Sequence, residues 1–105
     1  MTSLLALFVL WAGITAPVYL ENGICSGSQW ACVYPAEARL AGRPGSALIV
    51  VTSKLQRESP AFQARILAHE VGHVKYDLDE LRRGNRVSCR RARGMERELM
   101  ARLNR

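Results

Sequence analysis

Residues 59–78, SPAFQARILAHEVGHVKYDL, carry the signal that decides the fold. Ser59 can cap the free amides at the start of a helix, and Pro60 suits the first helical position. Apolar residues then recur at helical spacing, which predicts an amphipathic helix with one face packed on a core. This apolar stripe consists of Ala64, Leu67, Val71, Val74 and Leu78.

A second stripe of the same helix carries chemistry. It contains Phe62, Ile66, His69, His73 and Asp77, and the pentapeptide His69-Glu70-Val71-Gly72-His73 holds both histidines of the chain. Positions i and i+4 share a helix face, so two imidazoles can bind one metal ion. Zinc bound in this way activates a water molecule, and the adjacent Glu70 can accept the proton of that water. The spacing therefore predicts a Zn²⁺ site with Glu70 as general base.

Gly72 lies inside this predicted helix, where glycine costs roughly 1 kcal/mol relative to alanine. We expect the missing side chain to permit close approach of a neighbouring backbone beside the histidines.

A third ligand is needed, because catalytic zinc usually has three protein ligands and one open position. Asp77 lies on the histidine face, but eight residues beyond His69. That separation is about 12 Å along a helix, too far for one ion to bridge. We expect Asp77 to orient His73 instead.

The third ligand is expected on a second helix, from about Arg90 to Leu103. Glu96 lies within the apolar face of this helix, where a carboxylate is costly without a partner such as a metal ion. Glu98 lies on the arginine side. Helical position therefore favours Glu96, with Glu98 as the alternative. The apolar face comprises Ala92, Met95, Leu99, Met100 and Leu103.

The strongest strand signal is Ala47-Leu48-Ile49-Val50-Val51-Thr52, an apolar β-branched run that follows Pro44-Gly45. Beside the metal helix, such a strand can pair with an extended peptide substrate by strand addition. A plain core strand is the other interpretation.

The order of strand, His-Glu-x-x-His helix and later glutamate resembles the gluzincin metallopeptidases. The chain is most similar to the membrane-bound heat-shock and prenyl-protein-processing peptidases, over about residues 47–103. Val50–Leu55 resembles their edge strand, and Ile66–Val74 resembles their active-site helix. The resemblance implies zinc bound by both histidines, a glutamate base directly after the first, and a downstream glutamate as third ligand.

The chain departs from that family at the third ligand. The family glutamate typically begins the pattern E-x-x-A followed by Asp or Asn. Counted from Glu96, neither place fits; counted from Glu98, Ala101 fits and Arg102 does not. The family pattern thus favours Glu98 and the helix face favours Glu96, so both stay open.

The net charge of +6 is concentrated at one end of the chain. Residues 82–105 contain nine arginines and two glutamates, for +7, whereas residues 1–81 contain six basic and seven acidic side chains, for −1. No aromatic residue interleaves these arginines, so a solvated basic helix is favoured over a nucleic-acid interface.

These observations predict a zinc-dependent metallopeptidase that acts on a peptide or protein substrate. One alternative is a catalytically degenerate, zinc-stabilised binding protein. The other is a small membrane- or nucleic-acid-associated protein that acts through its arginine-rich tail. Nothing in the sequence bears on the oligomeric state.

Residues 1–20 contain no charged side chain, and Leu4 to Trp11 is nearly continuous apolar sequence. This length is near the minimum for a membrane span. A signal peptide with Ala16 near its cleavage site is the rival interpretation, and a buried core helix or strand is a third. An anchor or signal predicts a membrane-associated or exported protein.

The chain is therefore divided into residues 1–24, a hydrophobic signal or membrane anchor, residues 25–46, an irregular connector, and residues 47–105, a metallopeptidase-like domain. The expected fold class is α+β, a minimal zincin-like domain with an edge strand, a metal helix and a second ligand helix. A short helix is expected around residues 36–41 of the connector.

The three cysteines form no metal-ligand spacing pattern. Cys25 and Cys32 can close a short disulfide outside the cytoplasm, with Cys89 left free. Three reduced thiols are equally consistent with the sequence.

Overall fold

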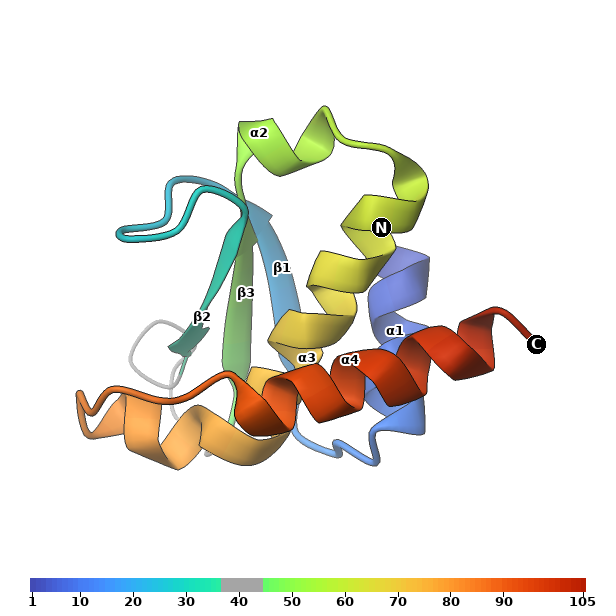
Figure 1. Cartoon of the computed structure of the whole chain (residues 1–105). Helices are drawn as coiled ribbons and strands as arrows, with labels where there is room; N and C mark the ends of the chain where they lie inside the picture. Colours follow the sequence, from blue (N-terminus) through green and yellow to red (C-terminus); the bar gives the residue numbers. More distant parts are fainter. Residues whose placement is uncertain (37–44) are drawn as a thin grey trace.

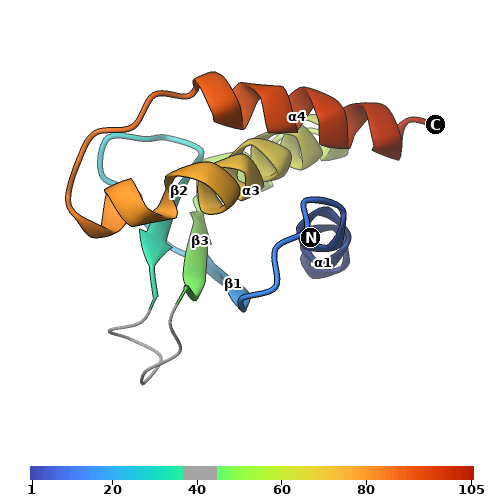
Figure 2. The ribbon, with the colours of Figure 1, turned by 90° about the horizontal axis from the view of Figure 1, so that it is seen from below.

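The computed structural model describes residues 1–36 and 45–105 of the chain. Along the chain its elements are α1 (Thr2–Trp11), β1 (Val18–Asn22), β2 (Ala31–Pro35), β3 (Ala47–Val51), α2 (Ser53–Gln56), α3 (Pro60–Arg82) and α4 (Arg90–Leu103). A three-stranded sheet lies beside α3, and α4 lies along α3 (Figures 1 and 2). The predicted α+β class is confirmed.

Strand β3 is the centre of the sheet, whose order is β1-β3-β2. It pairs in parallel with β1 and antiparallel with β2, and all five of its residues are buried. Ile49 and Val51 join the core with α3, while Leu48 and Val50 pack on the opposite face. The expectation of an edge strand here is wrong, because a continuous apolar run suits a strand that is covered on both faces. In the part of the chain that the structure describes, the edge strand that packs against α3 is β2.

Helix α3 forms where the sequence predicts it. The Ser59 hydroxyl accepts a hydrogen bond from the Phe62 amide at 3.2 Å, and Pro60 is the first helical residue. Leu67 and Val71 are fully buried in the core that α3 shares with the sheet and α1. This packing fixes which face of α3 turns away from the core.

The N-terminal segment belongs to the fold. Helix α1 has ten residues, about 15 Å, whereas the hydrocarbon core of a bilayer is about 30 Å thick. Its Leu5 and Phe8 are buried in the same core as α3, and Gly13, with φ of 71°, turns the chain toward β1. Within residues 1–36 and 45–105, no helix combines the length and apolar character needed to cross a membrane. The interpretation of residues 1–24 as a membrane-spanning anchor, and the membrane-associated or exported location based on these residues, are therefore corrected.

The segment predicted as an irregular connector, residues 25–46, contains strand β2. The prolines and glycines around it conceal this strand, and Pro35 is tolerated at its end because β2 is an edge strand. A disulfide joins Cys25 to Cys32 and leaves Cys89 free. The short helix expected around residues 36–41 falls mostly outside the described residues. The sheet thus unites strands from all three segments into which the sequence was divided.

Candidate metal centre

His69 and His73 lie one turn apart on α3, with ring centroids 4.9 Å from each other. Both rings face a cavity of about 530 Å³ between α3, β2 and the first half of α4. The core stripe of α3 holds the opposite face against the sheet. The predicted placement of the histidines off the core and toward a cleft is therefore what the structure has.

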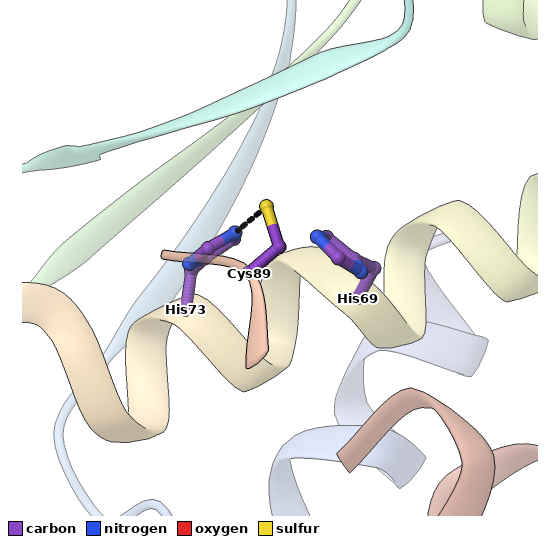
Figure 3. A group of neighbouring side chains, drawn as sticks. All are labelled: His69, His73 and Cys89. Atoms are coloured by element: carbon purple, nitrogen blue, oxygen red, sulfur yellow. Dashed lines mark hydrogen bonds between the residues drawn. The ribbon is translucent and has the colours of Figure 1, made fainter. Parts of the chain in front are cut away.

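A cysteine completes a group of three possible metal ligands. Cys89 immediately precedes α4, and its Sγ lies 3.7 Å from His73 Nε2. The ligand atoms of His69, His73 and Cys89 all lie within 4.8 Å of one another, and the three side chains point toward a common space (Figure 3). Tetrahedral zinc with N and S ligands has ligand atoms about 3.5 Å apart. These three residues can hold a metal ion.

Sequence patterns did not point to Cys89 as a ligand. It lies sixteen residues after His73 and belongs to no recognisable ligand spacing. One feature could have indicated this ligand: Cys89 lies directly before the predicted second helix, on the segment that returns past the histidines.

His73 is held by a carboxylate on its other ring nitrogen. Asp77 Oδ2 lies 2.8 Å from His73 Nδ1, and Asp77 Oδ1 accepts a hydrogen bond from Arg91 at 3.2 Å. The expected contact between Asp77 and His73 is therefore present. Burial lowers the pKa of His73 below its ordinary value, and the hydrogen bond to Asp77 opposes this effect. The ring is consequently neutral at neutral pH, the form that binds metals.

His69 has the same kind of partner from another helix. Glu96 Oε1 lies 2.9 Å from His69 Nδ1, while Glu96 Oε2 accepts a hydrogen bond from Arg65 at 3.1 Å. With a carboxylate on each Nδ1, the proton of each ring is held there and Nε2 is left for a metal.

The structure distinguishes the two glutamates that the sequence offers as third ligand, Glu96 and Glu98. Glu96 lines the cavity, as its place on the apolar face of α4 predicts, whereas Glu98 is exposed and does not line it. Glu96 nevertheless stands against Nδ1 of His69 and is not one of the three grouped ligand atoms.

Glu70 is buried and lines the same cavity as the histidines. Its burial raises the pKa of the carboxyl group from 4.5 to about 7. A carboxylate with a pKa near neutrality is suited to accept and return a proton.

Gly72 makes the arrangement possible. A Cβ atom built at this position would lie 2.7 Å from the Ala92 Cα and 2.9 Å from the Ala92 carbonyl oxygen of α4. The predicted close approach of a neighbouring backbone is confirmed. It brings α4 near enough for Cys89 and Glu96 to reach the histidines.

The remaining walls of the cavity are mostly apolar. Trp30, which directly precedes β2, packs edge-on against Phe62 of α3 with ring centroids 5.0 Å apart. Two arginines, Arg65 of α3 and Arg93 of α4, also line the cavity. The other apolar lining residues are Ala31, Val33, Ile66, Leu81 and Val87.

Comparison of the chain with protein-family models, curated proteins and solved structures found no match. The likeness to gluzincins thus rests on the sequence motif.

Proposed function

We propose that this protein is a zinc-dependent peptidase whose metal is held by His69, His73 and Cys89. The observation that carries the proposal is the convergence of these three ligand atoms within 4.8 Å, on the wall of a cavity that Glu70 also lines. Cys89 takes the place that the sequence assigns to Glu96 or Glu98. Two imidazoles and a thiolate favour zinc over Mg²⁺ or Ca²⁺, which prefer oxygen ligands.

The chain supplies the remaining chemistry. Zinc, when bound, supplies Lewis-acid activation of water and of the peptide carbonyl group. Glu70 takes a proton from the attacking water and returns it to the leaving amine, a role suited to its buried carboxyl group. Asp77 and Glu96 hold the two imidazole rings in the orientation that directs Nε2 toward the cavity.

Strand β2 supplies a place for the substrate backbone. Among the described residues it pairs with β3 alone, and its residues Ala31, Cys32 and Val33 line the cavity opposite the histidines. An extended peptide added to this free edge runs past the candidate metal site. The substrate strand expected on β3 is thereby transferred to β2, because both sides of β3 are already paired.

Zinc content and cleavage test the proposal together. Purified protein is expected to contain about one zinc per chain and to cleave an unstructured protein. Glu70→Gln is expected to keep the zinc and lower the cleavage rate by about 10²-fold or more. Glu98→Gln is the matched control, since the same chemical change is made on an exposed glutamate outside the cavity. Protein without zinc, or cleavage that survives Glu70→Gln, would contradict the proposal; zinc without any cleavage would favour the degenerate binding protein.

One observation supports a second candidate, a thiol hydrolase that needs no metal. Cys89, His73 and Asp77 follow one another through contacts of 3.7 Å and 2.8 Å, in the order of nucleophile, base and orienting carboxylate. A chelator separates the candidates. The zinc peptidase loses cleavage on chelation and recovers it with added zinc, whereas the thiol hydrolase keeps cleavage in chelator and loses it when Cys89 is alkylated.

A further inference from the structure

The arginine-rich helix α4 has two sides with different surroundings. On one side, Arg91 pairs with Asp77 and lies over the Tyr76 ring, and Arg102 lies over the Trp11 ring. These arginines contribute to the packing of the fold. Between the two sides, Ala92, Met95 and Leu99 are buried against the rest of the protein.

The other side of α4 borders the candidate active site. Arg93 lines the metal cavity, and Arg93 and Arg97 line a second hollow that continues from it. This hollow has a volume of about 510 Å³ and shares Arg65, Arg93 and Glu96 with the metal cavity. Both Arg93 and Arg97 are exposed, and within the described residues neither has an ion-pair partner.

The charges around this hollow are not balanced. Among the described residues Glu96 is the one acidic residue that lines it, and its two oxygens already contact His69 and Arg65. The positive charges of Arg93 and Arg97 therefore face the hollow without compensation, and a bound divalent cation nearby increases the positive potential. A cleft lined by one sign of charge attracts ligands of the opposite sign.

We propose that Arg93 and Arg97 select peptide substrates that carry an acidic side chain on the His69 side of the cleaved bond. This inference rests on the proposed function and adds the substrate class to it. The guanidinium groups pair with a carboxylate that occupies the hollow, while the substrate backbone lies along β2. The arginine run of the sequence, which fold packing explains only in part, thereby acquires a role at the site.

Paired peptides test this inference. One parent peptide is made in versions that place Glu at successive positions around the cleaved bond, each with a twin that has Gln in the same place. For the best position, wild-type protein is expected to show kcat/KM about fivefold higher for the Glu peptide, the size typical of an exposed ion pair. The preference should shrink as salt is raised.

Variants locate the preference. In the Arg93→Glu/Arg97→Glu double variant, the Glu-to-Gln ratio should fall below one. Arg105→Glu is the matched control, because Arg105 is exposed and lines neither hollow; its ratio should equal that of the wild type. Equal rates for the twins, or a ratio that persists in the double variant, would overturn the inference.

A binding measurement keeps this inference separate from the proposed function. If zinc-loaded protein cleaves neither twin, the peptidase proposal fails, and the Kd of the two fluorescently labelled peptides still gives the Glu-to-Gln ratio. Single-stranded DNA is the competing ligand for such arginines. DNA binding that the double variant abolishes, together with equal Kd values for the twins, would assign Arg93 and Arg97 to nucleic acid instead.

Discussion

The two histidines reach the same cavity from one helix, but their supports differ. The carboxylate that contacts the Nδ1 of His73 is local and buried. It belongs to Asp77, which lies one turn further along α3 and has 4% of its side chain exposed. The support of His69 comes from Glu96 on α4, 27 positions away, and is 18% exposed. In both cases an arginine pairs with the other oxygen of the carboxylate: Arg91 pairs with Asp77, and Arg65 pairs with Glu96.

The two histidines of one site are thus held in two different ways, one by a contact within a single helix and one by a contact between two helices. The contact between His73 and Asp77 lies within α3, and Arg91 of α4 pairs with the same carboxylate. The His69 side exists only when α4 is packed on α3. A buried carboxylate is also harder to replace by water than a partly exposed one, so perturbations of the two sides should differ in size.

The largest effect is expected at Cys89, the residue that α4 adds on the His73 side. Cys89→Ala removes a proposed ligand, and the zinc Kd should rise by more than about 100-fold, beyond the usual cost of losing a residue that only supports a ligand. Competition with a chelating dye measures this change. Ser88→Ala, next to it and exposed, is the control. If Cys89→Ala keeps its zinc while Glu96→Ala loses it, the third ligand belongs to the His69 side.

Glu70 lies between the two sides and gives a test that is independent of metal. Its pKa is raised to about 7, so the folded protein binds more protons than the unfolded chain between pH 4.5 and about 7. Stability contributed by this group therefore falls as the pH rises through that range. In chelator at pH 8, Glu70→Gln should raise the free energy of unfolding by up to about 3 kcal/mol, with little gain at pH 4. Urea denaturation measures it, and an equal gain at both pH values would contradict the raised pKa.

Matched amide substitutions compare the two sides directly. Asp77→Asn should raise the zinc Kd by about 30- to 100-fold, because the buried amide can donate to Nδ1 and place the ring proton on Nε2. Glu96→Gln should raise it by about tenfold or less, because water can reach the partly exposed position. Zinc titration of both variants measures the difference. Equal losses would show that burial does not distinguish the two sides.

The smallest effect is expected from separating the helices. Gly72→Ala places a methyl group against Ala92 of α4, which should cost about 1–3 kcal/mol of stability, partly offset by the roughly 1 kcal/mol that alanine gains within a helix. Zinc binding should weaken as Cys89 and Glu96 move outward. Thermal unfolding and zinc titration test this, with Gly94→Ala as control, since Gly94 lies in α4 with open space around it. Unchanged values for Gly72→Ala would mean that α4 adapts freely.

Residue patterns within a single helix were enough to predict the features of the structure that depend on that helix alone. Ser59, Pro60 and the apolar stripe of α3 fix that element, and its spacing gave the face shared by the histidines and Asp77. The close approach at Gly72 was also readable, because an interior glycine is costly without a packing reason. On α4, helical periodicity placed Glu96 toward the cavity and Glu98 away from it.

The parts that depend on tertiary packing were missed. Whether Glu96 meets a metal or Nδ1 of His69 depends on a distance of a few ångströms between α3 and α4, which periodicity does not encode. Cys89 was overlooked for the same reason. The apolar residues of α1 suited a membrane anchor as well as a core, and only the burial of Leu5 and Phe8 against α3 decides between them.

The close packing of α4 on α3 also has a consequence for timing. Chains emerge from the ribosome from the N-terminus onward, so α3 is available before α4. A nascent chain that ends within the loop after α3 has His69, His73 and Glu70 but neither Cys89 nor Glu96. If the protein is a hydrolase, its site is complete only after its own chain has folded around it. By then the segments that are most easily cleaved while unfolded have been buried.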